Sequence, residues 1–148
     1  MLTFSPIKES DAKELSVLDA NCFAVPWSET SFSNEANNPI ANYVIARIDD
    51  KIVGYAGFWA VTDEGQITNI AVLKEFRRQK IAHKMLTKLI EKAKEKNLCS
   101  LSLEVRESNI AAINLYSGFG FKPVGIRKNY YKNPTENAIL MDLIFERN

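Results

Sequence analysis

The feature that most constrains the fold is an amphipathic helix pattern set between two strand patterns. Apolar side chains recur at helical spacing over residues 81–93, and lysines lie off this face. Strand patterns precede the helix at Gln66–Val72 and follow it at Leu98–Val105. A strand, a helix and a strand in this order form a right-handed crossover, so we expect the two strands to be parallel in one sheet. Ligands of such sheets bind beyond the carboxyl ends of the parallel strands, here Ala71-Val72 and Val105-Arg106.

The remaining patterns predict an α/β fold: a mixed sheet with helices on its faces, forming a single domain over residues 1–148. Apolar residues make up 46% of the chain, which is enough to build a core. The expected order is β-α-α-β-β-β-α-β-α-β-β. The other strands are expected at Leu2–Ile7, Tyr43–Ile48, Lys51–Val61, Phe121–Arg127 and Ala138–Phe145. The other helices are expected to begin at the capping residues Asp11, Ser28 and Asn109, the last two ending near Asn37 and Ser117.

Charge and histidine content exclude several classes of function. Lys plus Arg number 19 and Asp plus Glu 18, which gives a formal net charge of +1. This balance argues against a surface built for nucleic acid or for an anionic membrane. His83 is the single histidine. Sites that need several imidazoles, including most zinc hydrolase sites, are therefore excluded, and we expect no metal.

The cysteines and the N-terminal residues indicate a reducing, cytoplasmic setting. Cys22 and Cys99 have neither a metal-binding nor a redox spacing, and they imply no disulfide framework. The first residues lack a basic region followed by an apolar run, so they do not form a signal peptide. No stretch of about 18 apolar residues is present to span a bilayer. We expect a cytoplasmic protein that is a monomer or a weak homodimer.

A basic cluster surrounds the first turn of the central helix. Five of the eleven residues in 74–84 (KEFRRQKIAHK) are Lys or Arg. Helix starts carry unpaired N–H groups and a partial positive charge, so they favour acidic side chains unless an anion binds there. The cluster therefore indicates a phosphate or pyrophosphate held by backbone N–H groups. From charge alone, a solvated basic surface remains an alternative. The glycine-rich patterns of nucleotide-hydrolysing loops and dinucleotide-binding folds are absent from the sequence.

This segment resembles the coenzyme A-binding segment of the GNAT N-acetyltransferase superfamily. The family pattern [Q/R]-x-x-G-x-[G/A] follows a strand, and here FRRQKIAHKML follows ITNIAV. Arg77 fills the first place and Ala82 the last, whereas Lys80 stands where glycine is usual. We expect Lys80 to donate its N–H from ordinary helical geometry. The resemblance implies contacts with acetyl-coenzyme A from Arg77, Arg78, Gln79, Lys80, Ile81, Ala82 and His83, with no role for the His83 ring.

A second segment is more specific. Residues 103–121 (LEVRESNIAAINLYSGFGF) resemble the E-V-R-x-S-N-x-x-A-x-x-L-Y-x-x-x-G-F signature of the ribosomal-protein alanine N-acetyltransferases, a branch of the GNAT superfamily. Pro26-Trp27-Ser28 resembles the P-W-S of that branch, and residues 127–131 resemble its R-x-N-Y-Y. The resemblance implies a GNAT-like fold and acetyl transfer to a protein N-terminus. In that branch, the substrate is the N-terminal alanine of a small-subunit ribosomal protein.

Two residues of this segment suit acid and base roles. Glu104 lies near the carboxyl end of its strand, where it can accept a proton from the attacking amine directly or through a water. Tyr116 carries a phenol with an ordinary pKa of about 10, which can protonate a thiolate leaving group. Alternatives remain for both residues, because Glu104 could form a surface ion pair with Arg106 or Lys122 and Tyr116 could simply be core.

Further residues are candidates for binding. Backbone N–H groups of Ile70, Ala71 and Val72 could stabilise the oxyanion if their strand splays there. The resemblance implies that this strand also pairs with the pantetheine arm and that Asn109 contacts the cofactor, although Asn109 could be only a helix cap. Amphipathic rings suit peptide contacts, which makes Trp27, Tyr130 and Tyr131 candidates to shape a substrate groove.

Two alternatives to the leading hypothesis remain open at this point. A GNAT enzyme could acetylate lysine side chains or a small amine, although a lysine pKa of about 10.4 demands more of the base. A non-catalytic acyl-coenzyme A-binding module would fit the departure at Lys80, but the presence of both Glu104 and Tyr116 argues against it. The leading hypothesis is transfer to a protein N-terminus, with no nucleic acid or membrane as partner.

Overall fold

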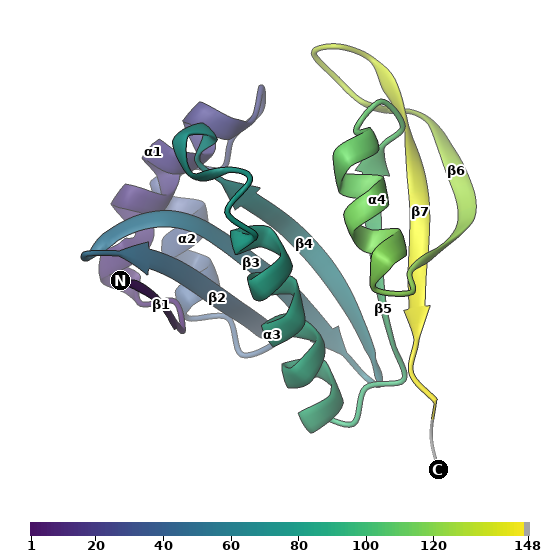
Figure 1. Cartoon of the computed structure of the whole chain (residues 1–148), viewed down its shortest axis with the longest axis horizontal. Helices are drawn as coiled ribbons and strands as arrows, with labels where there is room; N and C mark the ends of the chain where they lie inside the picture. The colour runs from purple at the N-terminus through teal and green to yellow at the C-terminus, as the bar shows by residue number, and fades with distance from the viewer. Residues whose placement is uncertain (147–148) are drawn as a thin grey trace.

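The computed structural model describes residues 1–146, which form a mixed seven-stranded sheet with helices on both faces (Figure 1). The order across the sheet is β1-β2-β3-β4-β5-β7-β6. The strands are β1 (Leu2–Ser5), β2 (Ala41–Ile48), β3 (Lys51–Val61), β4 (Glu64–Val72), β5 (Ser100–Arg106), β6 (Lys122–Tyr131) and β7 (Glu136–Ile144). The helices are α1 (Ala12–Cys22), α2 (Glu29–Ala36), α3 (Ile81–Glu95) and α4 (Ile110–Gly118), with short 3-10 turns η1 (Glu9–Asp11) and η2 (Lys74–Phe76). The expected element order and the mixed α/β fold are confirmed.

The strands flanking α3 are parallel, as the crossover rule predicts, but they pair over a short distance. Glu64–Gln66 of β4 lie opposite Ser100–Ser102 of β5, and every other neighbouring pair of strands is antiparallel. Within the described residues, no further pairing joins β4 to β5. The two strands diverge towards their carboxyl ends (Figure 1). This divergence leaves backbone groups of both strands without a sheet partner on that side.

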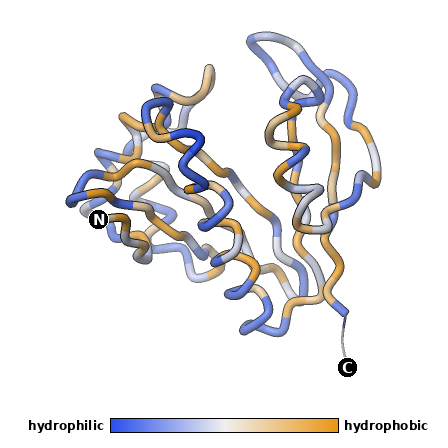
Figure 2. Tube along the Cα trace, viewed as in Figure 1, coloured by the Kyte–Doolittle hydropathy of each residue, from blue (hydrophilic) through white to orange (hydrophobic). Residues whose placement is uncertain are grey.

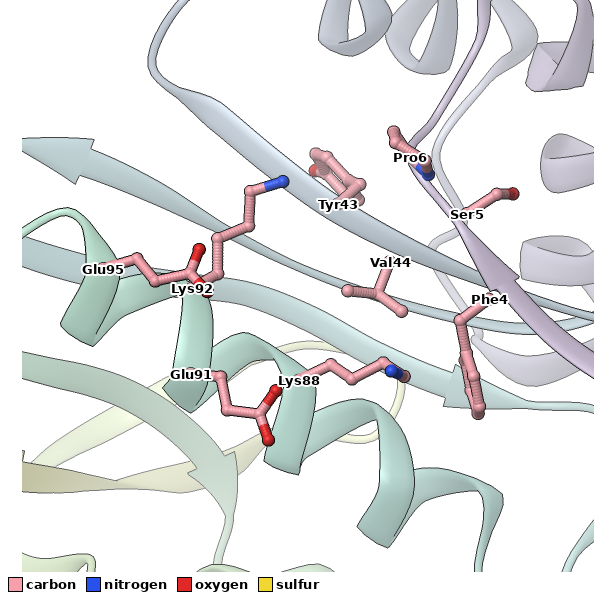
Figure 3. A pocket seen from close by; sticks show the side chains of 9 residues that line it. All are labelled: Phe4, Ser5, Pro6, Tyr43, Val44, Lys88, Glu91, Lys92 and Glu95. Carbon is pink, nitrogen blue, oxygen red and sulfur yellow. The ribbon is translucent and has the colours of Figure 1, made fainter.

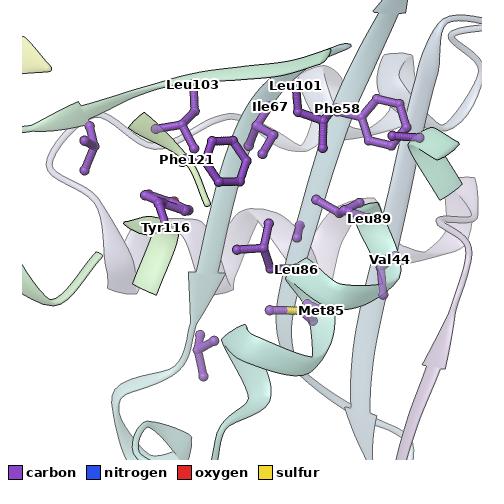
Figure 4. Close-up of a cluster of buried hydrophobic side chains, with 14 of the residues drawn as sticks. Val44, Phe58, Ile67, Met85, Leu86, Leu89, Leu101, Leu103, Tyr116 and Phe121 are labelled. Carbon is purple, nitrogen blue, oxygen red and sulfur yellow. The ribbon is translucent and has the colours of Figure 1, made fainter. Parts of the chain in front are cut away.

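Two hydrophobic clusters lie on opposite faces of the sheet. One joins α1 and α2 to β2 and β3 through residues such as Leu15, Phe32 and Tyr55. The other joins α3, α4 and β5 and contains Met85, Leu103, Tyr116 and Phe121, as Figure 4 shows. Alternate residues of β5 enter this second cluster, because successive side chains of a strand point to opposite faces.

Side chains of β5 alternate between the core and the opposite face of the sheet, and only those on the opposite face are available to a ligand. Leu101, Leu103 and Val105 are buried in the core as predicted. Ser102, Glu104 and Arg106 are only half-buried on the other face. The polar side chains of β5 are therefore directed away from α3 and α4.

Asp11 is the N-cap residue of α1 as predicted, but its side chain does not cap this helix, whereas Ser28 caps α2 with its side chain. The turn η1 precedes α1, and Asp11 makes no side-chain cap because its carboxylate is used elsewhere. One oxygen accepts the Lys8 N–H at 2.9 Å and the other accepts from Arg47 at 2.6 Å. Ser28 does cap α2, accepting the Ser31 N–H at 3.1 Å.

The strand ends also differ from the prediction. β6 continues to Tyr131 instead of ending at Arg127, since its last residues pair with Glu136 of β7 beyond an irregularity in the register. β5 begins at Ser100 rather than Leu98, whose backbone N–H bonds to Ala93 O at the end of α3. β6 therefore carries both tyrosines of the predicted substrate site.

Candidate active site

The start of α3 has the features of an anion site. Lys80 is the N-cap residue, no side chain caps this end, and the first turn contains no acidic residue. The carbonyl of Lys80 accepts the Lys84 N–H at 3.0 Å, which leaves the N–H groups of Ile81, Ala82 and His83 before the first helical bond. Figure 2 shows the segment directly before α3, residues 77–80 (RRQK), as hydrophilic.

The backbone of this loop departs from the expectation for Lys80. The residue does not have helical geometry but lies in the left-handed region, with φ 61° and ψ 22°. Arg78 is also left-handed, with φ 67°. Left-handed residues among turn residues gather backbone N–H groups into a concave anion-binding nest. This geometry gives a physical reason for the glycine usual at position 80, since a non-glycine residue there costs about 1–2 kcal/mol.

Arg77 is turned towards the end of β4. Its Nε donates to Val72 O at 3.1 Å, so the guanidinium fastens the loop to the strand. The same carbonyl accepts from Cys22 Sγ at 3.6 Å, which brings the end of α1 to this place. The end of β4, the start of α3 and the end of α1 therefore meet at Val72.

The backbone of β4 satisfies the condition set for an oxyanion site. Leu73 N–H donates to Val53 O of β3 at 2.8 Å. Because neighbouring residues of a strand point their backbone groups in opposite directions, the N–H of Val72 faces away from β3. Ile70 faces the same way, but its N–H donates to Asn69 Oδ1 at 3.1 Å. Val72 is thus the best-placed donor of the three candidates.

Glu104 lies on the facing side of the divergence, on β5. Its side chain is 19% exposed, and Oε1 is 3.6 Å from Arg127 Nε. Hydrogen bonding to Glu104 is the main cause that raises the pKa of the Tyr130 phenol, followed by burial. Neither ion pair considered from the sequence is present: Arg106 pairs with Glu136 at 3.2 Å, and the Glu104 partner is Arg127.

Tyr116 is both a core residue and a candidate acid. It is 8% exposed, and its ring centroid lies 5.7 Å from that of Phe121. Burial raises the pKa of the phenol well above its ordinary value, with a smaller contribution from Tyr131, so Tyr116 is protonated at neutral pH. Among the described residues, its hydroxyl has no recorded hydrogen-bond partner, so it is available to a ligand.

Tyr130 and Tyr131 form one aromatic unit at the end of β6. Their rings meet edge to face at a centroid distance of 5.1 Å. Tyr131 also stacks under the Arg106 guanidinium, 4.5 Å from the ring centroid. Burial, followed by the charge of Glu104, raises the pKa of Tyr131 to about 12. The pair therefore stands beside Glu104 in neutral form.

Asn109 and Trp27 lie on the segments that follow β5 and α1, respectively. Asn109 caps α4 through Oδ1, which accepts the Ala112 N–H at 3.2 Å. Trp27 lies in the loop between α1 and α2, where its ring packs 5.5 Å from that of Phe32. Its backbone N–H donates to the buried Asp19 at 2.8 Å. Trp27 thus follows α1, whose end contacts Val72 of β4.

The structure brings together groups that sequence patterns did not single out. Asp19 and the Arg106–Glu136 pair hold the segments that carry Trp27 and Tyr131, and Arg127 lies between Glu104 and Tyr130. The partners of these residues are distant in sequence. The sequence signal for Arg106 and Arg127 is their place in the two segments that resemble the family signature, E-V-R and R-x-N-Y-Y.

Other features lie apart from this region. Figure 3 shows a pocket between β1, β2 and the C-terminal half of α3, with lysines and glutamates in balance. Residues 1–146 include no group of three or more His, Cys, Asp or Glu side chains placed to hold a metal ion. Over the same residues, no helix has the length and apolar character needed to cross a membrane.

Comparison with known proteins agrees with this geometry. The model of the acetyltransferase (GNAT) family matches residues 12–121, which include the α3 start, Glu104 and Tyr116. The chain belongs to the GNAT family. The strand divergence, the α3 loop and the acid and base candidates are therefore parts of a GNAT domain.

Relatives within the GNAT family cover nearly the whole chain. The [ribosomal protein bS18]-alanine N-acetyltransferase of Escherichia coli (strain K12) is 34% identical over 145 residues, 97% of each chain. A Bacillus subtilis (strain 168) protein that provisionally carries the same name is 44% identical over 125 residues, 84% of this chain and 83% of that one. The crystal structure of the ribosomal-protein-S18-alanine N-acetyltransferase from Escherichia coli superposes with a TM-score of 0.92 at 32% identity, covering 100% and 96% of the two chains.

Proposed function

We propose that this GNAT protein transfers the acetyl group of acetyl-coenzyme A to the N-terminal α-amine of a protein, with the N-terminal alanine of ribosomal protein bS18 as substrate. The observation that carries the proposal is the pairing of an uncapped, basic helix start with a carboxylate across two diverging parallel strands. The names of relatives that align over 97% of the chain support the choice of substrate.

The residues around the α3 start fit the phosphates of coenzyme A. Backbone N–H groups of residues 81–83 are without a side-chain cap, and the left-handed Arg78 and Lys80 lie in the loop directly before them. Arg78 and Lys80 add positive charge, while Arg77 fastens the loop to β4. An anion gains both hydrogen bonds and a favourable helix dipole at such a place. Asn109 would contribute from the α4 side, since capping uses only its Oδ1.

Acetyl-coenzyme A supplies the acetyl group as a thioester. Glu104 accepts a proton from the incoming ammonium, directly or through a water, so that the amine nitrogen has a free electron pair. The nitrogen forms a bond to the acetyl carbon, and the Val72 N–H donates to the oxygen on which negative charge develops. The carbon–sulfur bond then breaks, and Tyr116 donates its hydroxyl proton to the leaving sulfur. The nitrogen loses its second proton to give the neutral amide, this proton restores the Tyr116 hydroxyl, and the proton on Glu104 passes to solvent.

The environment of Glu104 suits an α-amine better than a lysine side chain. An α-amine has a pKa of about 7.7–8.0, so a carboxylate can assist its deprotonation near neutral pH. A lysine ammonium, with a pKa of about 10.4, demands more of the same base. The Tyr130–Tyr131 unit beside Glu104 offers flat, amphipathic surfaces to the first residues of a peptide, and Trp27 follows α1, whose end contacts β4.

Two peptides test the reaction. One has a free N-terminal alanine and no lysine; the other has a blocked N-terminus and one internal lysine. We expect thiol release from acetyl-coenzyme A with the first only. Release with the second only would make the protein a lysine acetyltransferase. Binding of coenzyme A in a thermal shift assay, without release from either peptide, would favour a small-amine substrate or a binding module.

We also propose that the enzyme acts in the cytoplasm as a monomer or weak homodimer, without nucleic acid or membrane as partner. A net charge of +1 supports the absence of a dedicated polyanion surface. Light scattering across a concentration series, with and without ribosomal RNA, tests both parts. A stable higher oligomer or an RNA complex at physiological salt would contradict them.

A further inference from the structure

Arg106 is the centre of a set of contacts at the carboxyl end of β5. Its Nη2 donates to Lys132 O at 2.8 Å and its Nη1 donates to Pro134 O at 2.9 Å. Nη1 also lies 3.2 Å from Glu136 Oε1. One guanidinium thus binds two carbonyls of the β6–β7 turn (residues 132–135) and the first residue of β7. Within residues 1–146, no other β5 side chain donates a hydrogen bond to a carbonyl of this turn.

The same guanidinium supports the aromatic unit. Its central carbon lies 4.5 Å from the centroid of the Tyr131 ring, and Tyr131 packs edge to face on Tyr130. Tyr130 in turn lies beside Arg127, whose guanidinium is 5.8 Å from the Tyr130 ring centroid and whose Nε is 3.6 Å from Oε1 of Glu104, the proposed base. Arg106 therefore holds the turn that follows Tyr131 through hydrogen bonds, and it packs against one face of the Tyr131 ring.

Glu136 extends the contacts to the loop before α4. Its second oxygen accepts the Ser108 N–H at 2.9 Å, directly before the capping residue Asn109. Asn137 adds two further links, accepting the Asn129 N–H at 2.9 Å and donating to Glu107 Oε2 at 3.4 Å. The β6–β7 segment and the β5–α4 loop are consequently held together by polar contacts around one ion pair.

A planar fork is required for this arrangement. Arg presents several N–H donors in fixed directions and a flat face for stacking, whereas Lys has a single rotating ammonium. The Arg106 side chain is 27% exposed and that of Glu136 14% exposed, so solvent screens this pair only in part. Loss of the fork leaves two carbonyls of the turn and one of the two Glu136 oxygens without their Arg106 donor.

We propose that Arg106 is a positioning residue that holds the Tyr130–Tyr131 unit and the β6–β7 turn beside Glu104 for the acceptor peptide. The role rests on the proposed function, since the peptide is the substrate assigned to that side of the site. Arg106 does not contact the reacting atoms in this role. It acts through the turn and the aromatic pair, and it leaves the coenzyme A side at α3 unchanged.

Two readouts test the role, one of them independent of activity. We expect Arg106→Ala to raise amide hydrogen exchange across residues 128–137 by about tenfold or more, with no change in β2 and β3. We expect the KM for an alanine-terminated peptide to rise about tenfold or more, with the KM for acetyl-coenzyme A changed less than about twofold. Arg106→Lys should give a smaller rise in both, and Glu136→Gln, which keeps an acceptor for Arg106, a smaller rise again.

A matched control is Arg47→Lys, on β2. Arg47 is in an ion pair of 2.6 Å with Asp11 and is 20% exposed, so its environment resembles that of Arg106 at a distant strand. This variant should lower thermal stability while leaving the peptide KM unchanged. If Arg106→Ala fails to fold, Arg106→Lys and Glu136→Gln carry the same comparison.

Four results would contradict the role of Arg106 or the proposed function. Unchanged exchange over 128–137 would overturn the role of Arg106 in holding the turn. Raised exchange with an unchanged peptide KM would show that the turn does not serve the substrate. Equal rises in both KM values would indicate general loosening and also overturn the role. A wild-type protein that turns over no peptide would instead overturn the proposed function, and exchange would still show whether Arg106 holds the turn.

Discussion

Glu104 Oε1 on β5 lies 3.6 Å from Arg127 Nε on β6, across the intervening strand β7. The arginine is mostly exposed, at 58%, while the carboxylate is only 19% exposed. A contact of this length between unequal partners is weak and screened by water, so an incoming ammonium can replace the guanidinium. The contact with Arg127 therefore leaves the Glu104 carboxylate accessible to an amine.

Replacement of Glu104 tests its role as base. Glu104→Gln keeps the shape of the side chain but cannot accept the amine proton, so we expect turnover of the alanine peptide to fall about tenfold or more. The variant should fold normally, as judged by thermal unfolding. The exposed Glu91→Gln on α3 is the control and should retain full activity. Near-normal turnover of Glu104→Gln would remove this residue from the mechanism.

Tyr116→Phe separates the acid role from the packing role. The ring stays in the core, and the hydroxyl that is lost has no recorded partner among residues 1–146, so stability should change little. Turnover should fall about tenfold or more because the thiolate loses its proton donor. Tyr43→Phe is the matched opposite: its hydroxyl bonds to the buried Glu35 at 2.6 Å, so this variant should lose about 1–3 kcal/mol of stability. Unchanged turnover in Tyr116→Phe would leave that residue a core residue only.

Sequence periodicity was enough to predict the element order and the inner face of β5. These features depend on local patterns, such as the alternation around Leu101, Leu103 and Val105. The helix pattern that starts at Ile81 likewise marked the start of α3 correctly. Periodicity does not predict the backbone geometry of Lys80, the residue directly before α3. Lys80 is compatible with a helix by propensity, and only the complete loop forces it into the left-handed region.

The polar contacts of the candidate site depend on long-range register. Arg106 meets Glu136 because β5 pairs with β7 and places Arg106 opposite Ala138. Arg127 reaches Glu104 because β7 lies between their strands in the sheet. A pattern along the chain contains no information on which of several acidic residues an arginine will meet. The sequence therefore predicted the acid and base candidates but not the residues that hold their surroundings.

Lys80→Gly should stabilise the protein and preserve binding of acetyl-coenzyme A. Glycine adopts the left-handed geometry of position 80 without steric cost, so we expect a gain of about 0.5–1 kcal/mol after the entropy of the unfolded chain is included. Lys84→Gly, one turn later inside α3, should instead cost about 1 kcal/mol. Chemical denaturation measures both variants, and calorimetry with acetyl-coenzyme A measures affinity. A large loss of affinity in Lys80→Gly alone would show that the lysine side chain is itself a ligand.

The buried Asp19 makes stability depend on pH. Asp19 is 1% exposed and accepts from Tyr55 Oη at 2.6 Å and from the Trp27 N–H at 2.8 Å. Burial nevertheless raises its pKa above the ordinary value of 3.8 and outweighs both hydrogen bonds. In the window between 3.8 and the raised value, the folded state binds more protons than the unfolded state, so this contribution to stability falls as pH rises through the window.

Asp19→Asn removes this titration and keeps one acceptor oxygen. The free energy of unfolding of the wild type, minus that of Asp19→Asn, should therefore increase as the pH is lowered from 7 towards 3.8. Asp50→Asn is the control, because Asp50 is exposed and asparagine tolerates its φ of 70°. Urea unfolding at a series of pH values measures all three proteins. Parallel curves for the wild type and Asp19→Asn would mean that Asp19 titrates in the folded protein as it does in the unfolded chain, and that its two hydrogen bonds offset the cost of burial.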